Sequence, residues 1–278
     1  MSRILIFGAS GQVGHYLLPE LATRHSLIAV SRAPRIAESS WLCADINDER
    51  VNWPAAEIVI SLGPLDALAA WLDRYSGDAL RRVIALSSMS AESKIDSPDP
   101  VERDLAGRLN IAEVQVTRRA AASGIALTLF RPTLIYGAGS NSLSRIAAFA
   151  RRWHVLPVPI GARGLRQPVH ARDLARACVA ALENARTYGH IYPLGGGERL
   201  RFDEMLARLH GVLGGRVIQV PVPLVALSLA ARWRPAGGLF SAAAVARLRE
   251  GLIADNSAAQ RDFGYAPGAF DARAALPD

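Results

Sequence analysis

The fold is decided by the stretch ILIFGASGQVG, which runs from Ile4 to Gly14. Four apolar residues, typical of a buried strand, lead directly into a glycine-rich turn and then into a helical pattern. Gly8 permits the tight turn, Gly11 lets a ligand approach the backbone, and Gly14 allows the helix to pack close to the strand. Free amides at the start of that helix carry a partial positive charge. The stretch therefore predicts a seat for the pyrophosphate of a dinucleotide cofactor, contacted by Gly8, Ser10, Gly11, Gln12, Val13 and Gly14.

Short apolar runs alternate with helical patterns along the rest of the N-terminal half. The runs are dense in Val, Ile and Leu, as expected for strands that are buried on both faces. They are Ile4–Gly8, Leu27–Ser31, Trp41–Asp45, Ile58–Gly63, Val83–Ser88 and Leu127–Pro132. Helices are expected near 12–25, 65–75 and 101–123. This strand–helix–strand order predicts an α/β fold, a Rossmann-type doubly wound parallel sheet with helices on both faces.

The pattern changes after Pro132, where a Gly/Ser/Asn loop and further helical candidates follow. We expect a Rossmann domain over residues 1–136, completed by about 166–195, where His190–Leu194 is a further strand candidate. Residues 137–165 and 196–278 are expected to form a smaller, mostly helical part that binds substrate. Its later helix candidates are 202–213, 222–233, 241–250 and 256–263.

The stretch Val217–Trp233 is the most apolar of the chain. It is shorter than the roughly 20 apolar residues of a spanning helix, and it contains two prolines. A buried or surface-lying helix is the favoured interpretation, with peripheral membrane contact as its alternative.

Composition limits the other function classes. The net charge of +7 favours phosphate-bearing ligands, but the basic residues form no run of five, which disfavours nucleic-acid binding. The two cysteines, Cys43 and Cys178, lack the spacing of a disulfide framework or a metal site. With no signal-peptide pattern at the N-terminus, these features predict a cytoplasmic protein without a metal.

The end of the second strand decides between NAD and NADP. NAD-binding proteins usually place an acidic residue there, whereas this chain has Ser31 and Arg32, followed by Arg35. Because an arginine suits a 2′-phosphate, NADP is the expected cofactor and NAD the alternative. Ligands bind at the carboxyl ends of parallel strands, so four more residues are expected near the adenosine. They are Asp45, Ile46, Leu62 and Gly63.

Six motifs occur in an order that resembles the extended or atypical branch of the short-chain dehydrogenase/reductase superfamily, and more narrowly its NAD-dependent epimerase/dehydratase (nucleotide-sugar epimerase-like) family. They are GASGQVG at 8–14, Asp45-Ile46, LSSMS at 86–90, RPTLIYG at 131–137, QPVHARDLARA at 167–177 and YPLGGGE at 192–198. The resemblance implies a nicotinamide near Ser87, Ser88, Ser90, Pro132 and Leu134. It also implies that His170 lies near the cofactor or substrate entrance, and that helices after the fourth and fifth strands pair into homodimers.

The chain departs from this family at the proton-transfer pair. Active members carry Tyr-x-x-x-Lys on the helix after the fifth strand, but aligning the family's helix glutamate with Glu113 places Leu105 and Leu109 there. Proton transfer needs another group with a pKa near the working pH. Lys94, the only lysine beside 31 arginines, and Tyr136 follow strands on the active-site edge. Together with Ser88 they are the candidate catalytic residues, although Tyr136 equally fits a loop residue that packs under the cofactor.

Two functions remain open at this point. One is an NAD(P)-dependent oxidoreductase or epimerase-like enzyme with a non-standard acid/base and a small, anionic or nucleotide-sugar substrate. The other is a non-catalytic NADP(H)-binding sensor or structural protein of a larger assembly, which the missing pair favours.

Overall fold

Seven parallel strands form the central sheet of the computed structural model, which describes residues 1–33, 40–139, 141–233 and 242–276. The strand order is β11-β6-β5-β4-β1-β2-β3. The strands are β1 (Arg3–Phe7), β2 (Ser26–Ser31), β3 (Trp41–Cys43), β4 (Ile58–Ser61), β5 (Arg82–Leu86), β6 (Ala126–Pro132) and β11 (His190–Leu194). Every predicted strand of the sheet is confirmed. The order reverses between β1 and β4, the kind of switch point where open α/β sheets bind ligands.

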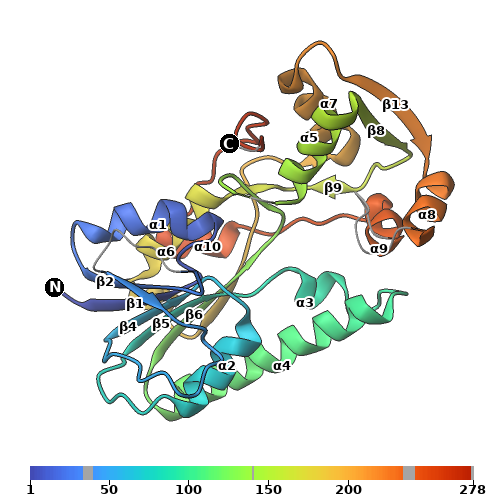
Figure 1. Cartoon of the computed structure of the whole chain (residues 1–278). Helices are drawn as coiled ribbons and strands as arrows, with labels where there is room; N and C mark the ends of the chain where they lie inside the picture. The colour runs from blue at the N-terminus through green and yellow to red at the C-terminus, as the bar shows by residue number, and fades with distance from the viewer. Residues whose placement is uncertain (34–39, 140, 234–241, 277–278) are drawn as a thin grey trace.

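Helices cover both faces of the sheet (Figure 1). Because successive residues of a strand point to opposite faces, Ile4 and Ile6 pack under one helical layer and Leu5 and Phe7 under the other. The first layer holds α1 (Gln12–Ala22), α6 (Ala171–Ala181) and α10 (Ser257–Phe263). The second holds α2 (Leu65–Arg74) and α4 (Pro100–Ala122). This arrangement confirms the predicted doubly wound fold.

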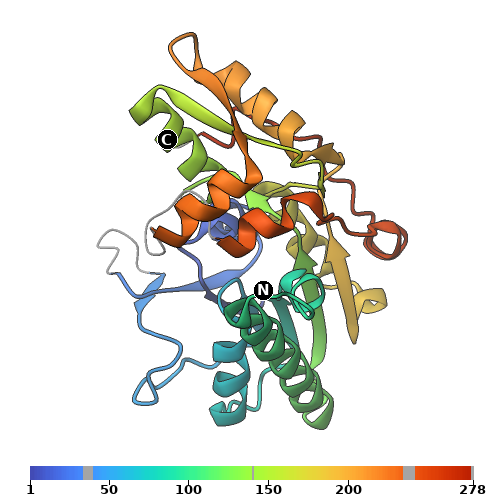
Figure 2. The same ribbon diagram turned by 90° about the vertical axis from the view of Figure 1, so that its right-hand side faces the viewer.

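A smaller part, which we call the cap, lies beyond the carboxyl edge of the sheet (Figures 1 and 2). It has its own apolar core, to which α5 (Ser142–Trp153) and α7 (Phe202–Leu213) contribute. Two strand pairs stand beside these helices: β8 (Val155–Ile160) with β13 (Ile218–Pro223), and β9 (Leu165–Arg166) with β12 (Leu200–Arg201). The cap continues through α8 (Leu224–Trp233), α9 (Ala242–Ala246) and the 3₁₀ turn η2 (Arg247–Arg249).

The apolar stretch Val217–Trp233 is divided between β13 and α8. Pro221 and Pro223 explain the division, since proline lacks the amide that a helix interior needs. Helix α8 accordingly begins only after the second proline, two residues later than predicted. Within the described ranges, no helix combines the length and apolarity needed to cross a membrane.

The C-terminal residues contribute to both parts of the molecule. Helix α10 and Tyr265 pack in the core around α1 and α6, whereas Phe270 and Ala275 pack in the core of the cap. The predicted division assigns all of residues 196–278 to the cap. In the structure, residues of this segment belong to both apolar cores. The division itself stays a prediction.

Short elements join the sheet to the cap. Helix α3 (Ser90–Ser93) follows β5, and β7 (Ile135–Tyr136), after β6, pairs in parallel with β10 (Val169–His170). Helix α6 ends at Ala181, and Asn184 then caps the 3₁₀ turn η1 (Ala185–Thr187).

Candidate functional site

The turn between β1 and α1 has room only for glycine at two positions. Gly8 has φ +72°, and a Cβ there would lie 3.0 Å from the backbone nitrogen of Gly63. A Cβ on Gly14 would lie 2.1 Å from the carbonyl oxygen of Ala9. The amide of Gly11 donates to the oxygen of Gly8 at 2.9 Å and closes the turn. These contacts hold the first turn of α1 directly at the end of β1.

The amides that open α1 have no side-chain cap from their N-cap residue, Gly11. Ser10 and Gly11 are exposed, Gln12 is half-buried, and Val13 is buried in the core between the sheet and α1. An exposed backbone with uncapped amides is the arrangement that accepts a pyrophosphate. The residues present therefore fit the phosphate moiety of a dinucleotide.

The ends of β2 and β3 lie beside this turn. The Ser31 hydroxyl contacts the Ser10 hydroxyl at 3.4 Å and accepts the amide of Ala33 at 3.3 Å. Arg32 is exposed at the same strand end, whereas Arg35 falls outside the described residues. Beyond β3, the carboxylate of Asp45 accepts the Asn47 amide at 2.9 Å.

Leu62, Gly63 and Ile46, which are predicted to lie near the adenosine, also lie at the carboxyl edge of the sheet. The amide of Leu62 donates to the Phe7 carbonyl at 2.9 Å, which places Leu62 and Gly63 directly under Gly8. Ile46 packs against the core between the sheet and α2. The predicted cofactor residues that follow β1, β2, β3 and β4 thus all lie at the carboxyl edge of the sheet.

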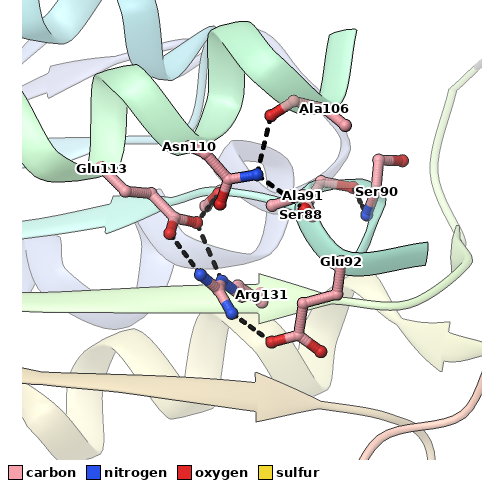
Figure 3. A network of polar contacts seen from close by, with 9 residues as sticks. Ser88, Ser90, Ala91, Glu92, Ala106, Asn110, Glu113 and Arg131 are labelled. Atoms are coloured by element: carbon pink, nitrogen blue, oxygen red, sulfur yellow. Dashed lines mark hydrogen bonds and ion pairs between the residues drawn. The ribbon is translucent and has the colours of Figure 1, made fainter. Parts of the chain in front are cut away.

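At the end of β5, the hydroxyl of Ser87 joins the ionic network of Glu113, Arg131 and Glu92, which are labelled in Figure 3. This hydroxyl donates to the Glu113 carboxylate at 2.5 Å. Arg131, on β6, bonds both oxygens of Glu113 and also pairs with Glu92 of α3. The hydrogen bonds to Glu113, together with the negative charges of Glu113 and Glu92, raise the pKa of Arg131 above its usual value. The network fixes the segment from Ser87 to Glu92 against α4.

The face of α4 that would present a proton-transfer pair is used for packing. Asn110 donates to the carbonyls of Ala91 and Ala106, at 2.8 and 3.0 Å, and so ties α3 to α4 (Figure 3). Leu109, where the family's lysine is expected, packs against the core under the sheet. At the aligned position of the lysine the described structure therefore has an apolar packing contact.

The remaining predicted nicotinamide-side residues lie along β6 and the loop after β5. Pro132 accepts the Met89 amide at 3.0 Å, and Leu134 accepts the Val169 amide at 2.9 Å and packs against the cap core. Ser88 is half-buried, and its hydroxyl accepts the amide of Ser90 at 3.1 Å. Ser88 and Ser90 thus close the turn that begins α3.

Lys94 and Tyr136, the other two candidate catalytic residues, go to different partners. The ammonium of Lys94 lies 3.5 Å from the carboxylate of Glu102. The hydroxyl of Tyr136 accepts the amide of Asp271 at 3.0 Å, and its ring is buried between His170 and Phe270. Burial raises the pKa of Tyr136 to about 12. The contacts described for Lys94 do not include Tyr136, nor those of Tyr136 the lysine.

His170 is buried where β10 meets α6. Its Nδ1 accepts the Arg172 amide at 3.0 Å and caps the helix. Burial, and then the charge of Arg172, lower the pKa of His170.

Sequence reasoning used Glu113 only to align the helix, and it missed Glu102, Arg131 and Arg247 as polar partners at this edge. Arg131 stands in the quoted RPTLIYG motif, so it could have been found there. Glu102 and Arg247, which also form an ion pair, are separated by 145 residues, and no local pattern connects them. Among the described residues, no group of three or more His, Cys, Asp or Glu could hold a metal ion.

Sequence comparison links the chain to one known family. The profile of the NAD-dependent epimerase/dehydratase family matches residues 80–195. The uncharacterized protein y4nG of Sinorhizobium fredii (strain NBRC 101917 / NGR234) is 26% identical over 223 residues, 78% of this chain. The alignment covers 54% of y4nG, so the chain spans about half the length of that relative.

Solved structures share the fold of the whole chain. UDP-glucuronic acid 4-epimerase from Bacillus cereus, in complex with NAD, is 16% identical with a TM-score of 0.73, over 99% of this chain and 97% of that one. MoeE5, in complex with UDP-glucose and NAD, is 18% identical with a TM-score of 0.75, over 98% and 95%. The profile match over residues 80–195 and the fold shared with these structures thus show what the chain resembles: the NAD-dependent epimerase/dehydratase family in part of its sequence, and nucleotide-sugar epimerases in its fold.

Proposed function

We propose that this chain binds NADP(H) at the carboxyl edge of its sheet, with NAD(H) as the weaker ligand, and that it does so without the superfamily's proton-transfer pair. The observation that carries the proposal is the glycine turn, in which Gly8 and Gly14 leave no room for a side chain. The solved relatives named above contain NAD, which supports a nicotinamide dinucleotide here.

In this proposal, each part of the cofactor is held by different residues of the carboxyl edge. The amides after Gly11 hold the pyrophosphate, Arg32 pairs with the 2′-phosphate, and Ile46, Leu62 and Gly63 lie along the adenosine. The segment Ser87–Ser90 faces the nicotinamide end, where the bound cofactor supplies hydride chemistry. Arg131 and Glu113 keep this segment in place.

Of the two roles predicted from the sequence, the contacts favour the non-catalytic one. A general acid or base works best with a pKa near the working pH, and the pKa of Tyr136 is about 12. Its hydroxyl and the Lys94 ammonium are both engaged with protein partners. We therefore propose a sensor or assembly subunit that responds to NADP(H).

The enzymatic role is the second candidate, and Ser88 and Ser90 are the observation in its favour. Both are half-buried at the carboxyl edge, where their hydroxyls can reach a hydroxyl or carbonyl group of a small anionic or nucleotide-sugar substrate. A homodimer through α2 and α4, peripheral membrane contact and a cytoplasmic location stay predictions.

Calorimetric titration with NADPH and NADH tests the binding proposal. We expect saturable NADPH binding in the wild type and its loss in Gly14→Ala, because the added Cβ would lie 2.1 Å from the Ala9 oxygen. The matched control is Gly107→Ala, at an exposed position of α4 with nothing within 4 Å, which should bind as the wild type does. Absence of saturable binding of both cofactors to the wild type would refute the proposal.

A turnover screen separates the two roles. The non-catalytic role predicts no NADPH oxidation above background with small carbonyl acids or nucleotide sugars. Oxidation that disappears in Lys94→Ala, at unchanged NADPH affinity, would instead establish the enzyme and place Lys94 in its mechanism.

A further inference from the structure

The first turn of α4 carries a buried carboxylate that the proposed cofactor site does not use. Glu102 is 7% exposed, and its side chain turns away from solvent toward α3 and the cap. It accepts the Ser97 hydroxyl at 2.8 Å, lies 3.5 Å from the Lys94 ammonium, and forms an ion pair with Arg247 of η2. One carboxylate therefore joins two cations from opposite sides of the junction between sheet and cap.

A third cation, Arg166, contacts the backbone of Arg247. The guanidinium of Arg166, on β9, donates to the carbonyls of Glu250 and Arg247, at 2.6 and 3.0 Å. Arg166 is buried. The carboxylate whose charge stabilises the charged form of Arg166 is that of Glu250, an exposed residue. Burial and the neighbouring charge of Arg247 lower the pKa of Arg166 to about 10. Arg166 thus holds the backbone that presents Arg247.

The positive charge of this junction is only partly balanced. Lys94 and Arg247 share one buried carboxylate, that of Glu102, while the guanidinium of Arg166 donates to backbone carbonyls. In addition, Nε of Arg247 is buried with no hydrogen-bond partner among the described residues. Buried charges and donors without partners are costly, and an incoming anion with several acceptor oxygens would satisfy both.

The location suits a ligand between the two parts of the molecule. Lys94 follows directly on α3, which begins at Ser90 next to the proposed nicotinamide end. Arg247 approaches from the cap, where α9 and η2 face α3 and the start of α4 (Figure 1). An anion held by both cations would therefore bridge the cap and the sheet.

We propose that Lys94 and Arg247 form a binding site for an anionic group, a phosphate or a carboxylate, and that Glu102 is the internal anion with which this group competes. The proposal does not depend on NADP(H) at Gly8–Gly14. It gives Lys94 an electrostatic task in place of proton transfer.

Inorganic phosphate is the probe, and its affinity is measured by calorimetry on the full chain. We expect saturable binding in the wild type and binding about tenfold tighter in Glu102→Gln, because the competing charge is removed while the shape is kept. Arg247→Gln and Lys94→Gln should each lose most of the binding. The matched control is Glu57→Gln, whose carboxylate pairs with Arg81 at the amino edge of the sheet and which should bind phosphate as the wild type does.

Two further readouts keep the outcomes apart. Unchanged NADPH affinity in each variant shows that it is folded, and an unchanged phosphate affinity in NADPH-loaded protein shows that phosphate does not occupy the Gly8–Gly14 turn. Phosphate binding that is equal in Glu102→Gln and Glu57→Gln, that survives in Arg247→Gln and Lys94→Gln, or that NADPH abolishes would overturn the proposal.

Discussion

Arg32 is the residue to which the proposed function assigns the choice between NADP(H) and NAD(H). It leaves the end of β2 exposed, next to Ser31, which contacts the Ser10 hydroxyl of the glycine turn. An exposed guanidinium beside the expected ribose can bond a 2′-phosphate in a charge-assisted manner, while a 2′-hydroxyl gains little from it.

We expect Arg32→Ala to weaken NADPH binding by about ten- to a hundredfold, the range of a lost hydrogen bond to a charged group. NADH binding should change little. Parallel titrations with both cofactors check this, with Arg24→Ala, an exposed arginine just after α1, as the control for net charge. An equal loss for NADH and NADPH would contradict the assignment of Arg32 to the 2′-phosphate.

His170 gives stability a pH dependence whose sign follows from its environment. Burial lowers its pKa in the folded protein below the ordinary value of about 6.5, which the unfolded chain keeps. As pH falls below that value, the unfolded chain takes up a proton that the folded protein resists. The folded state is then disfavoured.

The free energy of unfolding should therefore fall between pH 7.5 and 5.5, and His170→Asn should reduce that fall. Asparagine keeps an acceptor for the Arg172 amide, so the cap of α6 is retained. Denaturant unfolding at both pH values measures the effect, and His190→Asn, at an exposed histidine, is the control. A slope that is the same in His170→Asn and in the wild type would exclude His170 as its source.

At the level of elements, the sequence predicted what local patterns determine. Buried runs such as Ile58–Ser61 announce parallel strands, and the glycine turn announces the join of β1 and α1. Strand β13 escaped prediction because its apolar residues fit a helix as well as a strand, and its pairing with β8 is a contact between distant segments. Periodicity alone does not decide between the two for short apolar runs.

The site divides in the same way. That the proposed cofactor residues gather at one edge of the sheet could be predicted, because each follows a strand and parallel strands bring their carboxyl ends together. The partners of Glu102 and Tyr136 could not, because Arg247 and Asp271 come from the far end of the chain. The departure from the Tyr-x-x-x-Lys pattern is a prediction from the sequence, whereas the hydrogen bond by which Asn110 joins α4 to α3 comes from the structure.

At the scale of the whole molecule, the C-terminal segment joins two apolar cores. Helix α10 packs on the sheet beside α6, and a few residues later Phe270 and Ala275 are buried in the cap. The amide of Asp271 also donates to the Tyr136 hydroxyl, at the end of β7. The C-terminal residues therefore complete the core of the cap, while the helix just before them, α10, packs in the core on the sheet.

This arrangement predicts that the cap can lose stability while the sheet keeps its own. Phe270 is 6% exposed and its ring lies 5.1 Å from that of Tyr136, so Phe270→Ala should cost the cap core about 3–5 kcal/mol. Hydrogen exchange should accelerate in α5 and α7, while β1, β4 and β5 remain protected and NADPH affinity changes little. Phe149→Ala, on α5 and outside that core, serves as the control for loss of an aromatic ring. Equal acceleration in the cap and the sheet would mean that both cores unfold as one cooperative unit, and the predicted division of the chain would then be wrong.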